Sequence, residues 1–243
     1  MSRFSILHKH LPFFSAWGIY RQLKGQKEVA ARLPGYAGPL YFRNNPYDFA
    51  TFCEVSLEEA YRNELTTADF IIDGGGNIGL TAAYFARQYP GATIATVEPD
   101  SGNFDILKKN TAELVGVHPL QGGVWNKTAH LQVVDNGGGN NAFTVTEVDT
   151  PTDGSIKAYS IADIMALHGR TMVDIVKLDI EGAEKQVFGS GYENWLPHTR
   201  LLIVELHDRM VSGCSKAVFS AICQYDFRLE LRGENLFFYN ERV

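Results

Sequence analysis

The stretch from residue 73 to 79, DGGGNIG, has the composition of a ligand-binding turn. It follows the apolar run 70–72, and the acidic Glu98 ends the next apolar run, 95–97. A strand, a glycine-rich turn, a helix and a second strand ending in an acid form a unit that binds adenosine-containing cofactors. The glycines permit close backbone approach to a ligand, and the acid can accept hydrogen bonds from both ribose hydroxyls.

Two cofactors satisfy this pattern. Gly74, Gly76 and Gly79 match G-x-G-x-x-G, which permits a dinucleotide such as NAD(P). S-adenosylmethionine (SAM) instead carries a sulfonium and no pyrophosphate. Asp73 would repel a pyrophosphate but would attract the amino and sulfonium charges of SAM. The residues therefore favour SAM, with NAD(P) and a glycine turn without ligand as alternatives.

The turn and the strands around it supply the expected cofactor contacts. The glycines and Asn77 would line the methionine and ribose, Asp73 would engage the amino group or a water beside it, and Glu98 would take the ribose hydroxyls. Asp100 would lie against adenine, and Trp125 could stack on adenine or belong to the core. The full set of expected cofactor residues is Asp73, Gly74, Gly75, Gly76, Asn77, Gly79, Glu98, Asp100, Gly123, Val124 and Asp179.

A second group of chemically capable residues follows two later apolar runs. Asp179 and Glu181 follow the first run, and Glu205 and His207 follow the second. Because side chains alternate along a strand, the members of each pair share a face. If the two strands are neighbours, three carboxylates and one imidazole meet at one sheet edge. Such a cluster is costly to assemble unless it does chemistry or binds cations.

The elements that must position these residues alternate between strands and helices from residue 68 onward. The patterns predict strands at 69–73, 93–97, 118–124, 173–179 and 201–206, helices at 78–88, 101–115, 160–168, 182–190 and 213–225, and a β-hairpin at 129–134 and 142–148 around the Asn/Gly loop 136–141. The last two strands, 226–232 and 235–240, are joined too tightly to be parallel. We therefore predict an α/β fold: a doubly wound, mostly parallel, seven-stranded Rossmann-like sheet with an antiparallel C-terminal hairpin. That hairpin is typical of class I methyltransferases and further favours SAM.

Several segments carry a likeness to one family. They are DGGGNIG at 73–79, VEPD at 97–100, VKLDIEGAE at 176–184 and VELH at 204–207, together with the stretch 43–61 upstream. These segments resemble the FkbM-type SAM-dependent methyltransferases, with Gly75-Gly76 standing where the family usually has a Gly-Ala pair. The resemblance implies O-methylation of a hydroxyl on a sugar, glycan or secondary metabolite. It also implies SAM as the methyl donor and a small-molecule or glycan acceptor.

Methyl transfer to a hydroxyl requires alignment of three atoms and removal of one proton. His207 is the first candidate for the base, and Asp179 could be base, orienting residue or metal ligand. Glu181 could bind the acceptor or cap the helix that starts near Gly182. Lys177 is expected to pair with these carboxylates.

The same cluster could also hold a metal. Asp179, Glu205 and His207 offer oxygen and nitrogen ligands suited to a divalent cation such as Mg²⁺ or Mn²⁺. The spacing matches no recognised metal motif, so the cation is an additional possibility beside direct base catalysis.

The N-terminal region differs in character from the rest. We expect residues 1–65 to form a helical extension or lid and residues 66–243 to form the SAM-binding methyltransferase domain. His8, Lys9 and Pro12 interrupt the apolar character of the first twenty residues, which excludes a signal peptide or spanning helix there. This basic, aromatic segment would pack as a helix over the main sheet, cover the substrate, or touch a membrane surface weakly.

Bulk composition narrows the functional classes. The net charge of −6 argues against nucleic acid as a partner. The three cysteines, Cys53, Cys214 and Cys223, lack metal-binding spacing and predict reduced thiols in a cytoplasmic protein. An NAD(P)-dependent oxidoreductase is the alternative enzyme, although 243 residues leave little room for its substrate domain. A non-catalytic SAM-binding protein is the other alternative, and a homo-oligomer is compatible with everything above.

Overall fold

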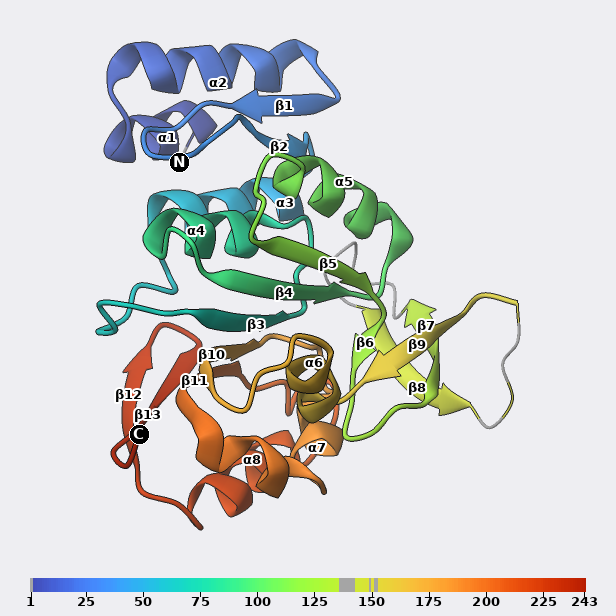
Figure 1. Ribbon diagram of the computed structural model, residues 1–243. Coiled ribbons are helices and arrows are strands. Elements are labelled where there is room, and N and C mark those ends of the chain that lie inside the picture. Colours follow the sequence, from blue (N-terminus) through green and yellow to red (C-terminus); the bar gives the residue numbers. More distant parts are fainter. Residues whose placement is uncertain (1, 136–142, 149, 151–152) are drawn as a thin grey trace.

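The centre of the molecule is a seven-stranded sheet, which lies between two layers of helices in Figure 1. The computed structural model describes residues 2–135, 143–148, 150 and 153–243. In sheet order the strands are β12 (Phe227–Arg232), β13 (Asn235–Asn240), β11 (Thr199–Glu205), β10 (Val173–Leu178), β3 (Phe70–Gly74), β4 (Thr93–Glu98) and β5 (Val117–Gln121). β13 is antiparallel to both its neighbours, and the other neighbouring pairs are parallel. The predicted sheet and its C-terminal hairpin are confirmed.

Helices cover both faces of this sheet. α4 (Leu80–Gln88) and α5 (Ser101–Thr111) lie on one face, and α6 (Ile161–Leu167), α7 (Glu184–Val187) and α8 (Cys214–Ile222) lie on the other (Figure 1). Successive residues of β3 point to opposite faces, so Ile71 joins one core with Phe85 while Ile72 joins the other with Val187. Burial on both faces explains why the strands are continuous apolar runs.

The N-terminal region contains strands as well as helices. α1 (Arg3–His10) and α2 (Phe13–Gly25) are followed by an antiparallel pair, β1 (Glu28–Ala31) and β2 (Leu40–Arg43). The side chain of Asn110 on α5 bonds both backbone groups of Tyr41, which fastens β2 to the helical layer. β2 and the layer of α4 and α5 thus separate α1 and α2 from the main sheet (Figure 1). The expectation of a first helix packed directly over that sheet is therefore wrong, because the β1–β2 pair provides a nearer surface.

The outer face of α2 carries exposed aromatic rings. Phe13, Phe14 and Trp17 are 51%, 86% and 50% exposed, and Arg21 and Lys24 follow on the next turns. Weak contact of this segment with a membrane surface stays a prediction. Within the described residues, no helix combines the length and the apolar character needed to cross a bilayer.

The structure differs from the sequence-based elements in three places. The predicted strand 118–124 divides, because β6 (Gly123–Val124) leaves the main sheet to pair with β9 (Ser155–Tyr159), which was not predicted. β9 also pairs with β7 (His130–Asp135), which forms the predicted hairpin with β8 (Phe143–Val148). The Asn/Gly loop 136–141 lies outside the described residues.

The third difference concerns residues 47–64, where the spacing of Phe49, Phe52, Leu57 and Tyr61 predicts a single helix with one apolar face. α3 (Pro46–Thr51) begins at the Asn45 cap and continues into a π-helix, η1 (Phe52–Leu57). π-helical turns are rare in proteins, and those that occur are often found at functional sites. The chain then reaches β3 through Tyr61, which is buried.

Candidate active site

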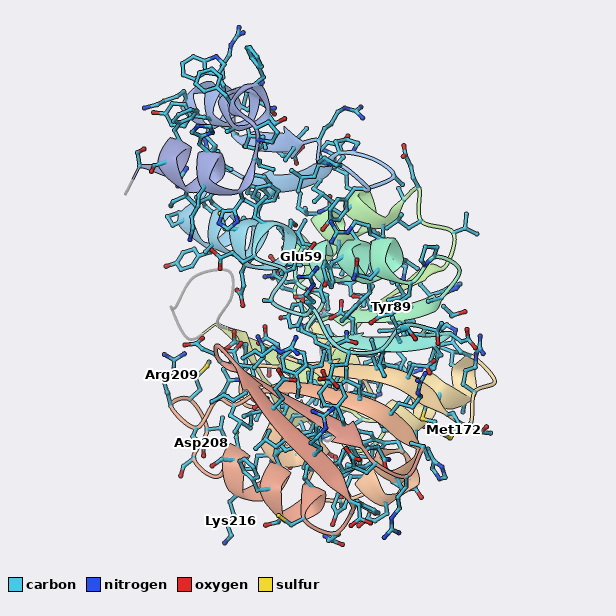
Figure 2. The ribbon with its side chains drawn as sticks, turned by 90° about the vertical axis from the view of Figure 1, so that its left-hand side faces the viewer. Glu59, Tyr89, Met172, Asp208, Arg209 and Lys216 are labelled. Carbon is cyan, nitrogen blue, oxygen red and sulfur yellow. The ribbon has the colours of Figure 1, made fainter. Side chains whose placement is uncertain are left out.

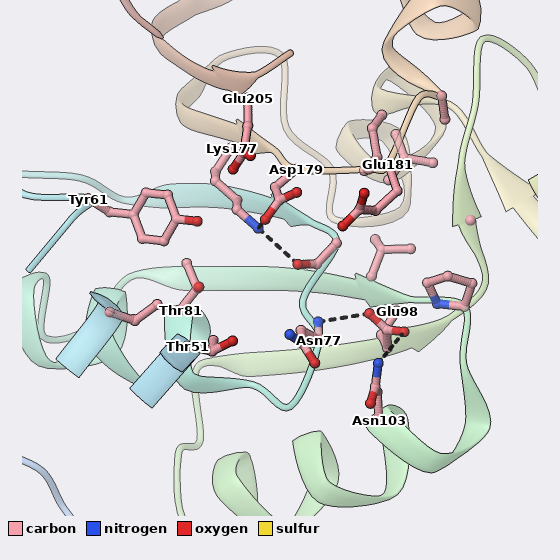
Figure 3. Close-up of a pocket in the computed structure, with 18 of the residues that line it drawn as sticks. Thr51, Tyr61, Asn77, Thr81, Glu98, Asn103, Lys177, Asp179, Glu181 and Glu205 are labelled. Carbon is pink, nitrogen blue, oxygen red and sulfur yellow. Dashed lines mark hydrogen bonds and ion pairs between the residues drawn. The ribbon is translucent and has the colours of Figure 1, made fainter. Parts of the chain in front are cut away.

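A cavity of about 230 Å³ opens at the carboxyl ends of β3, β4, β10 and β11. The strand order reverses between β3 and β10, and this is where ligands bind in open α/β sheets. Polar side chains that line the cavity come from both halves of the sheet and from η1 (Figure 3). They include Glu54, Tyr61, Asn77, Glu98, Asn103, Lys177, Asp179, Glu181, Glu205 and Glu234.

The turn after β3 is packed tightly against its neighbours. A Cβ on Gly75 would overlap the carbonyl oxygen of Asp179, and a Cβ on Gly76 would overlap the hydroxyl of Thr96. The amides of Gly75 and Gly76 donate to the carbonyl oxygen of Val97, at 3.0 and 2.8 Å. The packing of the protein itself therefore already requires glycine at both positions, and close approach of a ligand to this turn stays a prediction.

Gly75 provides a stability prediction with an internal control. Gly75→Ala should lower the free energy of unfolding by about 2–5 kcal/mol, because Gly75 has φ +77° and its Cβ would overlap the β10 backbone. Gly91→Ala, at φ +92° with open space around its Cβ, should lose only about 1–2 kcal/mol. Urea denaturation measures both, and equal losses would contradict the packing argument.

Glu98 ends β4 and is held in the cavity by backbone donors. Its Oε2 accepts from the amide of Asn77 at 2.8 Å, and its Oε1 accepts from the amide of Asp100 at 2.9 Å. Only 4% of the residue is exposed, and this burial raises the pKa of Glu98 to about 7 despite the hydrogen bonds. Glu98 thus lies in the cavity at the carboxyl end of β4, and its contact with a cofactor ribose stays a prediction.

Some of the residues predicted to contact a cofactor are among the described residues that line the cavity, and others are not. Gly75, Asn77, Gly123 and Val124 line the cavity, as do Glu98 and Asp179, whereas Asp73, Gly74, Gly76, Gly79 and Asp100 do not. Asp73 is fully buried, accepts from the Thr96 hydroxyl at 2.9 Å and lies 3.4 Å from the Lys177 ammonium. Asp100 caps α5 by accepting from the amide of Asn103.

Of the two roles expected for Trp125, stacking on adenine or packing in the core, the structure supports packing in the core. Its ring is buried in a small cluster with Leu131, and its Nε1 donates to Glu147 at 3.2 Å. Trp125 is therefore a core residue and is not among the described residues around the cavity.

Lys177 fastens the glycine turn to β10. Its ammonium donates to the carbonyl oxygen of Gly75 at 2.8 Å and lies 4.0 Å from Asp179 (Figure 3). It also lies 3.4 Å from the buried Asp73. Burial alone would lower the pKa of Lys177, but Tyr61 and the two carboxylates raise it above its usual value. Lys177 is the predicted carboxylate partner, and its hydrogen bonds assign it a positioning role.

The structure brings together the carboxylates and the histidine that follow β10 and β11. The Nε2 of His207 lies 3.6 Å from Asp179, 3.5 Å from Glu181 and 3.6 Å from Glu205. Its Nδ1 lies 2.9 Å from the buried carboxylate of Glu184, which the sequence analysis did not consider. Each ring nitrogen thus faces carboxylate oxygens.

This arrangement does not support His207 as the general base. Burial lowers the pKa of His207, but the hydrogen bond to Glu184 and the surrounding carboxylates raise it to about 9. Unless a cation takes the place of its proton, the ring is then protonated at neutral pH, and His207 is not among the described lining residues. The acidic residues in front of it are the groups that an acceptor would meet.

Glu181 belongs to the cavity and does not cap a helix. α7 begins at Glu184, later than predicted, and its N-cap, Ala183, provides no side-chain bond. Glu181 has φ +51°, which is rare for a residue with a side chain and typical of functional positions. Burial and the charge of Asp179 raise the pKa of Glu181 to about 7, and the same causes act on Glu205.

Two cavity residues come from the segment before the main domain. Glu54 lies on η1, and burial raises the pKa of its carboxyl group. Tyr61 lies near Lys177, whose ammonium is 5.5 Å from the centre of the ring. The sequence signals for this segment were the resemblance of the stretch 43–61 to a region upstream of the family's catalytic domain and, for Tyr61, the helical spacing of the apolar residues.

Comparison with known proteins decides the family. Residues 73–229 match the model described as the methyltransferase FkbM domain. The chain belongs to the FkbM methyltransferase family. The matched range starts at the acid before the glycine turn and contains Glu98, the cluster around His207 and α8. The family predicted from the sequence motifs is thereby confirmed.

Three relatives define the extent of the similarity. Methyltransferase sdnD of Sordaria araneosa is 30% identical over an alignment of 165 residues, and the match covers 54% of this chain and 64% of sdnD. The 31-O-demethyl-FK506 methyltransferase FkbM of Streptomyces tacrolimicus is 21% identical over 72% of this chain and 78% of that protein. The crystal structure of methyltransferase FkbM from Methylobacillus flagellatus KT shares the fold, with a TM-score of 0.52 and 14% identity, over 98% of this chain and 58% of that one. The chain spans less than two thirds of sdnD and of the Methylobacillus protein.

Proposed function

We propose that this FkbM-family protein transfers a methyl group from SAM to a hydroxyl of a sugar, glycan or secondary metabolite. The observation that carries the proposal is the charge of the cavity. Its described lining contains six carboxylates, Glu54, Glu98, Asp179, Glu181, Glu205 and Glu234, and a single cation, Lys177. Lys177 already pairs with Asp73 and backbone carbonyls.

This charge distribution favours SAM over a dinucleotide. A pyrophosphate needs donors or cations in front of it, whereas Lys177 is the only lining cation described here and is engaged elsewhere. The ammonium and sulfonium of SAM would be stabilised by the same carboxylates that repel a pyrophosphate. With SAM bound, Glu98 and Asn77 would meet the ribose, and Gly123 and Val124 would flank the adenine. The residues fit SAM.

The chain's own residues would align the reaction and receive the proton. Bound SAM supplies an electrophilic methyl group, so the protein must hold the acceptor oxygen in line with it. The carboxylates of Asp179, Glu181 and Glu205 face Glu98 across the cavity (Figure 3) and can accept a hydrogen bond from the acceptor hydroxyl. A carboxylate placed in this way can take the hydroxyl proton during attack, which contributes about 10²–10⁴-fold.

The choice of oxygen as the methyl acceptor is supported by a relative. The Streptomyces tacrolimicus protein is named for methylation at an oxygen, the 31-O position of demethyl-FK506. The acidic lining suits a neutral, hydroxyl-rich acceptor, because each carboxylate can accept hydrogen bonds from it. An anionic acceptor would be repelled.

A methyl-transfer assay tests the proposal. The chain is incubated with methyl-labelled SAM and a panel of sugars, polyols and polyketide alcohols, and label in the product is counted together with S-adenosylhomocysteine (SAH). We expect labelled ether from at least one hydroxyl acceptor. Binding of NADH with no binding of SAM would establish the oxidoreductase alternative. Binding of SAM without SAH from any acceptor would favour a non-catalytic role.

The titration of Glu98 predicts a pH dependence of SAM binding. Its pKa in the free chain is about 7, and ribose hydroxyls bind the ionised form better, so binding should release a proton. The affinity for SAM should rise roughly five- to tenfold between pH 6 and pH 8, measured by calorimetry. Glu98→Gln should remove most of this dependence. A flat profile in the unmodified chain would contradict the role of Glu98.

A further inference from the structure

The ring of His207 is fixed with one nitrogen directed at the acidic cluster. The residue is 3% exposed, and its Nδ1 lies 2.9 Å from Glu184, which is itself fully buried. Glu184 also accepts a hydrogen bond from the amide of Ile180, which holds its carboxylate in place. A buried carboxylate on Nδ1 is the arrangement that orients a histidine so that Nε2 can bind a metal.

The distances around Nε2 are those of ligands around an ion. Charge-assisted hydrogen bonds are about 2.7–2.9 Å long, but Nε2 lies 3.5–3.6 Å from oxygens of Asp179, Glu181 and Glu205. Neighbouring ligands at about 2.1–2.5 Å from one ion are separated by roughly 3.0–3.6 Å. The donor atoms of Asp179, Glu205 and His207 all lie within 4.8 Å of one another. One nitrogen and two carboxylates therefore surround a common point.

The negative charge at this end of the cavity would also be stabilised by a cation. Asp179, Glu181 and Glu205 lie within 4 Å of a single imidazole, and Glu54 and Glu234 line the same cavity. Lys177 reaches Asp179 only at 4.0 Å, because its ammonium binds the glycine turn. A divalent ion among these oxygens would remove most of their mutual repulsion.

We propose that Asp179, Glu205 and His207 bind a divalent metal ion and that Glu184 positions His207 for it. The mixed carboxylate and imidazole set suits Mn²⁺ or Mg²⁺. Three protein ligands leave three positions of an octahedral ion free, and two of them can hold adjacent oxygens of one molecule. Resting on the proposed function, this assigns the acceptor class: a compound with two neighbouring oxygens, such as a vicinal diol. The ion lowers the pKa of the hydroxyl that it holds, and Glu181 remains beside it to receive the proton.

Binding of Mn²⁺ alone tests the metal site without SAM or acceptor. The full chain is treated with a chelator and titrated with Mn²⁺, and free Mn²⁺ is followed by electron paramagnetic resonance. We expect one site per chain, with a ¹⁴N coupling from His207 in the spin-echo spectrum that is lost in His207→Gln. Glu205→Gln and Asp179→Asn should weaken binding at least tenfold, and Glu184→Gln roughly 10–100-fold.

A matched control and a fold check accompany these variants. Asp208→Asn removes a carboxylate next to His207 in sequence that instead bonds the amides of Gly213 and Ser215, and it should leave Mn²⁺ affinity unchanged. Thermal melting shows whether each variant is folded. If Glu184→Gln is unfolded, the Mn²⁺ affinity of Glu205→Gln tests the metal site instead. Absence of stoichiometric Mn²⁺ binding, or binding that survives all ligand variants, would overturn the metal site. Because the assay contains no SAM, such a failure leaves the proposed methyl transfer to be judged by its own assay.

Discussion

Asp179→Asn is expected to lower methyl-transfer turnover by roughly 10²–10⁴-fold and to weaken SAM binding much less, by about tenfold at most, because the other cavity carboxylates remain. Asp179 directly follows β10 and lines the cavity. It lies 3.6 Å from His207 and 4.0 Å from Lys177. It therefore faces the place where the acceptor oxygen must lose its proton. Asparagine keeps the shape but can neither take a proton nor bind a metal strongly. Single-turnover kinetics and calorimetry measure the two quantities.

Asp208→Asn is the control for this variant. Figure 2 shows Asp208 at the outer surface beside α8, where its carboxylate accepts from Ser215 and Gly213. It removes the same charge from the same region without touching the cavity. Turnover should be unchanged within about twofold. If Asp179→Asn retains full turnover, the acidic cluster is not the reacting end of the site.

Glu98→Ala is expected to weaken SAM binding by roughly 100-fold or more. Two hydrogen bonds to a charged group are each worth about 1.5–3 kcal/mol, and the ribose would lose both. The substitution also frees the amides of Asn77 and Asp100, which now donate to this carboxylate. Glu98→Gln keeps an acceptor for one of them and separates the loss of charge from the loss of the turn. Calorimetric titration with SAM measures all three proteins.

Asp100→Asn supplies the matched control for Glu98. Asp100 lies two residues further along the same turn, but its side chain caps α5 by accepting from Asn103. SAM affinity should remain within about threefold. An equal loss in both variants would mean that the β4–α5 turn as a whole, and not Glu98, determines binding.

The sheet and the position of Glu98 in the cavity could be predicted because their signals are local in sequence. The apolar run before DGGGNIG, the length of the helix and the acid at residue 98 define one β–α–β unit, and its register follows from the period of the strands. The convergence of Asp179, Glu205 and His207 also followed, because neighbouring parallel strands end at one edge. The spacing of apolar residues thus indicates on which face of a strand or helix a side chain lies.

The acceptor end could not be predicted to the same depth, because it depends on distant contacts. Periodicity shows that Tyr61 lies on an apolar face but not that this face covers Lys177 of β10. Glu184 belongs to a motif noticed for its family likeness, yet only the folded chain shows it against the Nδ1 of His207. The same holds for the glycines, whose neighbour Asp179 follows β10 and whose neighbour Thr96 lies on β4.

A crystal structure of the chain with SAH tests the central claim most directly. Our account predicts the nucleoside across the carboxyl ends of β3 and β4, with both ribose hydroxyls within hydrogen-bonding distance of Glu98. The sulfur should point toward Asp179 and Glu205. Ribose density that lies away from Glu98, or a cavity that takes NADH while SAH stays unbound at millimolar concentration, would contradict it.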